Sequence, residues 1–198
     1  MLLGTIKAPQ REIALAAKEV GIPLERIKAV LYQESGGVVF WKLSGYKDPV
    51  PPLNFEGHWF RRLTRTVFDK VAPSLSLRVA DRLFGAGEWK RFSAAAKLDR
   101  KAAIEAAGWG AFQIMGFHWK RLGFKSADEF AAAMLTVKGQ IKAFVRFIET
   151  HPFKGLKQAL IDGNWPVFAH YYNGENYRVN RYDEGLAKFD ALARADKI

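Results

Sequence analysis

The segment from Pro23 to Gly37 constrains the fold of this chain more than any other stretch of its sequence. Leu31, Val30 and Ile27 lie three, four and seven positions before Glu34. In an α-helix these positions share one face, so an apolar stripe ends in a carboxylate. The proline at the start of the segment suits a first helical turn, and the two glycines at its end suit a helix stop. The sequence therefore predicts a helix that directs a charged group toward the protein interior.

Most of the remaining chain has the period of short helices, with one β-favouring interruption. Apolar residues recur at helical spacing in Arg11–Val20, Ser126–Leu135, Val137–Thr150, Trp165–Tyr172 and Asn180–Ala195. Val38–Leu43 and Val50–Phe55 favour β-structure and flank a turn-forming segment, which predicts a small β-hairpin, although prolines weaken the second piece as a strand. No repeat or linker divides the chain. We therefore predict a mainly α fold with a small β-hairpin element, in which residues 1–198 form a single domain.

The composition narrows the class of partner. The chain holds 31 Lys and Arg against 20 Asp and Glu, and its formal net charge is +11. This surplus favours a polyanion such as nucleic acid, acidic lipid or an anionic cell wall, or it serves solubility alone. The chain has no cysteine, which excludes disulfides and thiolate chemistry. The longest apolar run, about Phe130–Leu135, is too short to span a bilayer, and we expect neither a signal peptide nor integral membrane association.

The inward position of Glu34 has a chemical consequence. Burial on an apolar face raises the pKa of a carboxyl, so that it can hold a proton near neutral pH and then donate it. A general acid that breaks a glycosidic bond needs this property. Two plainer alternatives stay open: Glu34 turns outward at the helix end, or it pairs with one of the many Lys and Arg side chains.

Three further stretches carry groups that could hold a substrate. In Gly108–Gly116, small residues allow close approach and Gln113 offers a donor and an acceptor, although it could simply satisfy core backbone. Tyr172 faces inward at the end of a predicted helix, but the following Asn173-Gly174 is also a common helix stop. The third stretch, Asn54–His58, places Glu56 and His58 after the predicted hairpin, where a plain strand-to-helix junction is the alternative.

Metal chemistry has no support in the sequence. It contains no HExxH motif and no cysteine cluster, and its histidines, His58, His118, His151 and His170, are scattered along the chain. We therefore predict neither a metal nor a cofactor.

Taken together, the Glu-Ser pair, the Gly-x-Phe-Gln-Ile segment and the Tyr-Asn-Gly triplet occur in an order that resembles the lysozyme-like superfamily. Goose-type lysozymes and soluble lytic transglycosylases share this order. The chain is more similar to the phage-type N-acetylmuramidase family, known mainly as endolysins. The resemblance runs from about Ile27 to Leu186, and the segments that carry it are Glu34–Gly37, Phe55–Thr64, Ala107–Trp119, Phe144–Ile148 and Tyr172–Gly174.

The chain also departs from the family pattern at three places. Gly57 stands where the family usually has a basic residue, Val50–Asn54 is less strand-like, and Glu175 replaces a common proline. These departures concern the hairpin more than the acid.

The resemblance implies a lysozyme-like helical domain that cleaves the β-1,4 bond between N-acetylmuramic acid and N-acetylglucosamine, with Glu34 as general acid. By the same matching, Ser35 orients the acid, Gln113 lines the substrate cleft, and Tyr172 with Asn173 positions substrate or water. The further residues expected to bind substrate are His58, Trp109 and Gly110. The expected partner is bacterial peptidoglycan, without nucleic acid, bound by a monomer that has no separate wall-binding module. Such an enzyme would be made in the bacterial host cytoplasm and reach the periplasmic cell wall through a holin or a secretion machine.

The second catalytic group and the reaction outcome stay open at this point. Glu56 is the candidate for a base that activates water, and Asp48 is a weaker one. A lytic transglycosylase needs neither, because the 6-hydroxyl of the sugar attacks and leaves a 1,6-anhydro end. A non-enzymatic alternative is a basic helical protein that binds nucleic acid, although Lys and Arg are not concentrated on any one predicted helix.

Overall fold

The computed structural model describes residues 1–76 and 83–198 of the chain. Its α-helices are α1 (Gln10–Val20), α2 (Leu24–Ser35), α3 (Gly57–Leu63), α4 (Pro73–Ser76), α5 (Ala86–Leu98), α6 (Arg100–Glu105), α7 (Ala127–Met134), α8 (Val137–Glu149), α9 (Leu156–Asp162), α10 (Trp165–Asn173) and α11 (Tyr182–Arg194). Two 3-10 helices, η1 (Gly116–His118) and η2 (Glu175–Asn180), follow β5 and α10. The strands are β1 (Leu2–Lys7), β2 (Val38–Leu43), β3 (Leu53–Phe55), β4 (Ala107–Trp109) and β5 (Ile114–Met115).

The fold is mainly α with small antiparallel sheets, which confirms the predicted fold class. The helices predicted from apolar spacing are present, with ends that differ from the prediction by a few residues. In α2 the predicted stripe is buried, because Ile27, Val30 and Leu31 expose 1% of their surface or less. The helix ends at Gly36, whose φ of +61° is the left-handed conformation that glycine adopts without steric cost.

The strand pairing differs from the predicted hairpin. Val38–Leu43 is a strand, but it pairs with β1, which the sequence pattern did not indicate. The second piece is shorter than predicted and pairs, as β3, with β4 of another sheet. A single bridge between Trp41 and Val50 is what joins the two pieces. The prolines that follow explain the difference, since Pro51 and Pro52 have no N–H to continue a ladder.

The segment Gly108–Gly116 forms most of a β-hairpin. Strands β4 and β5 pair within it, and residues 110–113 form the turn. Gly110 has a φ of +73°, and a Cβ there would come within 2.9 Å of the buried Gln140 side chain. Backbone conformation and space thus both require glycine at this position.

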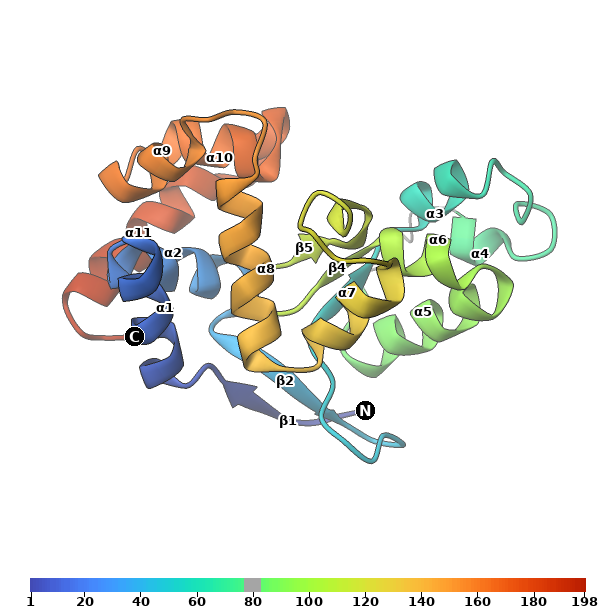
Figure 1. The fold of residues 1–198 in the computed structure, drawn as a ribbon. Coiled ribbons are helices and arrows are strands. Elements are labelled where there is room, and N and C mark those ends of the chain that lie inside the picture. The colour runs from blue at the N-terminus through green and yellow to red at the C-terminus, as the bar shows by residue number, and fades with distance from the viewer. Residues whose placement is uncertain (77–82) are drawn as a thin grey trace.

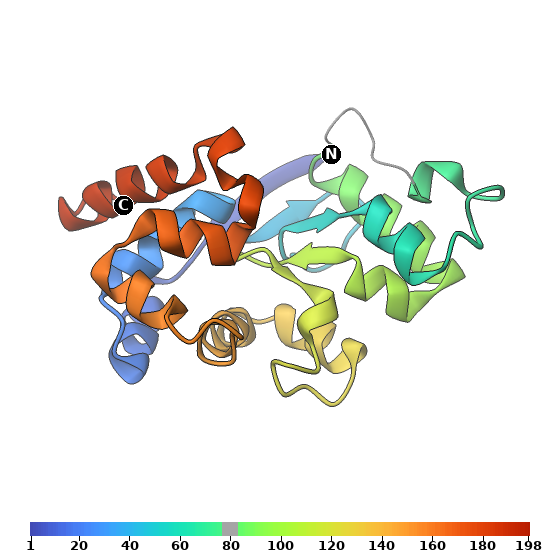
Figure 2. The ribbon, with the colours of Figure 1, turned by 90° about the horizontal axis from the view of Figure 1, so that it is seen from above.

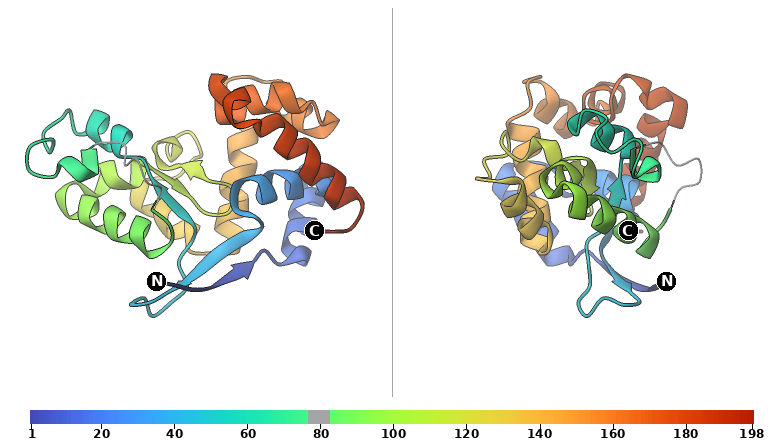
Figure 3. Two further views of the ribbon diagram at one scale, coloured as in Figure 1. Left: turned by 180° about the vertical axis from the view of Figure 1, so that it is seen from behind. Right: turned by 90° about the vertical axis from the view of Figure 1, so that its right-hand side faces the viewer.

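In the view of Figure 1, helix α8 stands between two groups of helices. One group contains α1, α2 and α9–α11, and the other contains α3–α6, with strands running between them (Figures 2 and 3). Gln140 of α8 links the parts: its amide oxygen accepts from the Ala111 N–H (2.8 Å), and its amide nitrogen donates to the carbonyls of Val39 (3.0 Å) and Met134 (2.9 Å). This buried side chain fixes the β4–β5 turn against β2 and α7.

Candidate active site

A cavity of about 780 Å³ lies where the two groups of helices meet the strands. Its lining comes from α2, β1, β2, β3, β4, β5, α10, η2 and α11, together with α5 and the residues before it. Six of the residues predicted from sequence line it: Glu34, Ser35, Glu56, Gln113, Tyr172 and Asn173. The chain therefore brings together side chains from four stretches that are far apart in sequence.

Glu34 lies at the C-terminal end of α2 on the wall of this cavity. Burial raises the pKa of its carboxyl from 4.5 to about 7, and a hydrogen bond from the Tyr182 hydroxyl opposes part of this rise. The apolar stripe of α2 is the local cause, because it directs the end of the helix toward the core and away from water. A carboxyl with this pKa carries a proton in an appreciable fraction of molecules at neutral pH.

Two tyrosine hydroxyls lie near Glu34. Tyr182, at the start of α11, donates its O–H to the Glu34 Oε1 atom, and Tyr172 of α10 donates its O–H to the Phe112 carbonyl (2.8 Å). Burial raises the pKa of both phenols well above 10, and the negative charge of ionised Glu34 raises them further. Both tyrosines therefore stay neutral and act as fixed donors.

Tyr182 is a site residue that sequence reasoning missed. Its spacing to Leu186 on α11 is helical and both side chains are buried, so an inward orientation could have been predicted. The contact with Glu34 joins residues 148 positions apart, and no local pattern contains it.

The resemblance implied that Ser35 orients the acid, but its hydroxyl is hydrogen-bonded within its own helix. Its hydroxyl donates to the Leu31 carbonyl one turn earlier in α2 (3.0 Å), and the phenol of Tyr182 contacts the Glu34 carboxylate instead. Ser35 does line the cavity, so a contact with substrate stays a prediction.

Glu56 also lines the cavity, at the junction of β3 and α3. Asn54 donates its amide N–H to Glu56 Oε1 (2.7 Å), and the Nδ1 atom of His58 lies 3.4 Å from Oε2. The Glu56 side chain is 31% exposed, so this carboxylate keeps contact with water. His58 stands outside the cavity lining and reaches the site through its contact with Glu56.

Gln113 lies in the β4–β5 turn with a φ of +50°. Its side-chain amide donates to the Gly110 carbonyl (2.8 Å), which leaves the amide oxygen toward Gly108 and the cavity. A Cβ at Gly108 would lie 3.2 Å from this oxygen, so glycine there leaves room for the amide. The side chain is held in place and retains an acceptor.

Trp109 and Gly110 lie outside the cavity lining, although both were predicted to bind substrate. The Trp109 ring is 2% exposed, donates its N–H to the Ile104 carbonyl (3.0 Å), and packs edge-on against Trp89 and Phe92. Gly110 forms the turn against Gln140 described above. Both residues shape the hairpin that presents Gln113, and neither faces the cavity.

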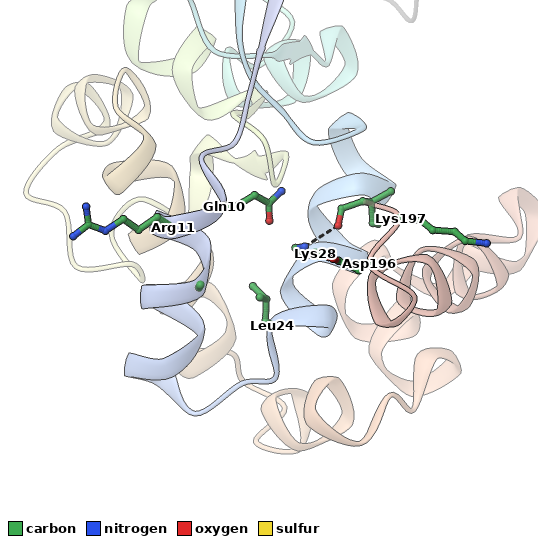
Figure 4. A pocket seen from close by; sticks show the side chains of 8 residues that line it. Gln10, Arg11, Leu24, Lys28, Asp196 and Lys197 are labelled. Carbon is green, nitrogen blue, oxygen red and sulfur yellow. Dashed lines mark hydrogen bonds between the residues drawn. The ribbon is translucent and has the colours of Figure 1, made fainter.

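A second hollow, of about 610 Å³, lies between α1, α2 and the last residues of the chain (Figure 4). In it Lys28 donates to the Ile198 carbonyl (2.7 Å), while Arg11 and Lys197 point away from its centre. None of the predicted site residues lines it. The larger cavity is therefore the candidate active site.

Two structural properties bear on cofactors and membranes. Within residues 1–76 and 83–198, no three His, Asp or Glu side chains are grouped so that they could hold a metal ion. Over the same ranges, no helix is both long and apolar enough to cross a lipid bilayer.

Comparison with known proteins identifies the family. The family model for muramidases, described as N-acetylmuramidase, matches residues 23–194. The chain belongs to the N-acetylmuramidase family. The crystal structure of the Burkholderia AP3 phage endolysin is similar to this muramidase, with a TM-score of 0.76 and 35% sequence identity over 94% of this chain and 71% of that one. A search of the curated proteins finds no significant match. The residues matched to the family include every predicted site residue. Strand β1 lies before the matched residues, yet its Leu2 and Thr5 also line the cavity of the muramidase.

Proposed function

We propose that this muramidase degrades bacterial peptidoglycan as a phage-type endolysin, by cleaving the β-1,4 bond between N-acetylmuramic acid and N-acetylglucosamine. The observation that carries the proposal is the Glu34 carboxyl, which lies on a cavity wall with a pKa of about 7. The volume of about 780 Å³ is in the range that encloses small ligands, so a short piece of glycan can occupy it.

Glu34 acts as the general acid. Its proton passes to the bridging oxygen as the bond from that oxygen to C1 of N-acetylmuramic acid breaks, and the N-acetylglucosamine end leaves as an alcohol. Tyr182 holds the carboxylate that results, because its O–H donates to the oxygen of Glu34. Tyr172 and Asn173 border the same cavity and position substrate or water near the scissile bond.

Glu56 acts on the attacking water. It takes a proton from the water as the water oxygen bonds to C1, which yields a free reducing end with inverted configuration. Its contact with solvent lets a water molecule reach it, and the hydrogen bond from Asn54 holds its side chain in place. Lytic transglycosylation is the second candidate reaction, in which the 6-hydroxyl replaces this water.

The surface charge fits the same substrate. Peptidoglycan and the polymers attached to it are anionic, and the net charge of +11 raises the rate at which the enzyme meets them. We propose that the enzyme works as a monomer on the periplasmic cell wall, after release through a holin or a secretion machine.

Mass spectrometry of soluble muropeptides released from purified peptidoglycan tests the proposal. We expect the parent enzyme to release fragments with free reducing N-acetylmuramic acid ends, each one water heavier than an anhydro product. Glu34→Gln cannot donate the proton, and we expect its rate to fall by about 10²- to 10⁴-fold with the fold retained. Glu19→Gln makes the same change at an exposed position on α1 and serves as the control. Release of muropeptides by Glu34→Gln at the parent rate would refute the role of Glu34.

A further inference from the structure

Strand β3 ends directly before Glu56, and one of its two edges pairs with β4. The Gly110 N–H donates to the Pro52 carbonyl (2.8 Å), and the Glu56 N–H donates to the Ala106 carbonyl (2.9 Å). Phe55 lies between these residues, and neighbouring residues of an antiparallel strand point their backbone groups to opposite edges. The N–H and C=O of Phe55 therefore point away from β4, to an edge with which no strand of residues 1–76 and 83–198 pairs.

Side chains of α5 cover this second edge. Glu88 Oε2 accepts a hydrogen bond from the Phe55 N–H (2.8 Å), and Arg91 Nη1 donates to the Phe55 carbonyl (3.1 Å). The Trp89 ring nitrogen donates to the Pro51 carbonyl (3.0 Å). Side chains from one turn of α5 thus make the hydrogen bonds to this edge that the backbone of a neighbouring strand would otherwise make.

Glu88 is unusual among these contacts because it is a carboxylate with 5% of its surface exposed. Burial raises its pKa, while the Phe55 N–H and the charge of Arg91 lower it and the charge of Glu56 raises it. Burying a carboxylate is costly unless its oxygens are satisfied, and an apolar residue here would leave the Phe55 N–H without an acceptor. Glu88 also lines the same cavity as Glu34 and Glu56.

We propose that Glu88 is a positioning residue for the reaction: it holds Phe55 on the free edge of β3 and so fixes Glu56 at the cavity wall. This inference rests on the role proposed above for Glu56. Glu88 acts through a hydrogen bond to backbone, and its charge is secondary.

Two single variants separate the effect of the length of the Glu88 side chain from the effect of its charge. Glu88→Gln loses the charge and keeps an oxygen that reaches the Phe55 N–H, so we expect kcat within about threefold of the parent. Glu88→Asp keeps the charge and is one methylene too short, so we expect kcat to fall by about 10- to 100-fold with KM nearly unchanged. Glu19→Gln and Glu19→Asp make the same two changes on the exposed face of α1 and should leave both constants unchanged. Circular dichroism confirms that each variant is folded, and a greater kcat for Glu88→Asp than for Glu88→Gln would overturn the proposal.

Combination with Glu56→Gln tests whether Glu88 acts through Glu56. If it does, Glu88→Asp adds at most about twofold to the loss that Glu56→Gln already causes, because residues that act as a unit are not additive. Multiplication of the two losses would show that Glu88 acts independently, and would overturn the positioning role. Glu34→Gln in the same assay keeps the two proposals apart. Full activity of Glu34→Gln contradicts the proposed function, whereas an inactive Glu34→Gln with multiplying losses contradicts only the role of Glu88.

Discussion

The two sides of the cavity give a glutamate side chain different surroundings. On the helical side, Glu34 is half-buried on the cavity wall, where burial raises the pKa of its carboxyl to about 7 and the Tyr182 phenol donates a hydrogen bond to it. On the strand side, Glu56 is 31% exposed, accepts from an amide and lies beside a histidine. Burial raises the pKa of a carboxyl, so the surroundings of Glu34 suit a proton donor, whereas Glu56 is placed where water can reach it. Environment alone can therefore give two glutamates the two roles that glycoside cleavage needs.

The two sides are also held in place differently. The helical side depends on apolar packing, such as the stacking of the Phe168 ring on the Tyr172 ring, whose centroids lie 5.0 Å apart. The strand side depends on hydrogen bonds from β4 and from α5 to the backbone of β3. Changes on the helical side should therefore alter the titration of Glu34, whereas changes on the strand side should alter the attack by water.

The largest effect expected in this comparison comes from Glu56→Gln. A neutral amide cannot take a proton from water, and we expect kcat to fall by about 10²- to 10³-fold while the fold is retained. The rate of muropeptide release and the masses of the products measure this. A near-parent rate with 1,6-anhydro products would show that the sugar's own hydroxyl attacks, and that the strand side only binds substrate.

The stability of Glu34→Gln should depend on pH. The pKa of Glu34 is about 7 in the folded state against 4.5 in the unfolded one, so folding takes up a proton between these values. The favourable contribution of Glu34 is therefore complete below pH 4.5 and is lost as the pH rises through about 7. Relative to the parent, the free energy of unfolding of Glu34→Gln should rise by up to about 3 kcal/mol between about pH 5 and about pH 8.

Urea unfolding at both pH values measures this change, with Glu19→Gln as the control at an exposed position of α1. A difference between Glu34→Gln and the parent that stays constant with pH would mean that the helical side does not shield Glu34 from water.

Tyr182→Phe should have the smallest effect of the three. The variant loses the hydrogen bond that lowers the pKa of Glu34, so this pKa rises and the acid stays protonated to higher pH. Loss of one hydrogen bond changes kcat at low pH by about fivefold, or ~1 kcal/mol. The pH profile of kcat measures it, and its high-pH limb should move toward higher pH. An unmoved limb would show that Tyr182 does not act on the acid.

Local pattern predicted one side of the cavity better than the other. The stripe of α2 and its end at Gly36 follow from helical spacing and glycine, both of which are visible within a dozen residues. The pairing of β1 with β2 joins segments far apart in the chain, and a strand's partner is not encoded in its own residues.

The site shows the same division between local and distant information. Gln113 and Tyr172 were found because motif order marks them, and both line the cavity. Trp109 belongs to the same specific block but packs in the core. It was predicted to bind substrate because a motif does not distinguish a residue that binds substrate from one that supports the loop. Tyr182 and Glu88 were missed, because their partners are Glu34 and a backbone N–H in other elements.

A titration of the Glu34 side-chain carboxyl by carbon-13 NMR tests the central claim most directly. Assignment by comparison with Glu34→Gln identifies the signal, and its chemical shift follows the proton itself without any assay of activity. We predict a midpoint at about pH 7, the value expected for a carboxyl whose burial among α2, α10 and α11 disfavours its charged form. A midpoint near 4.5, the value of an ordinary glutamate, would contradict the account.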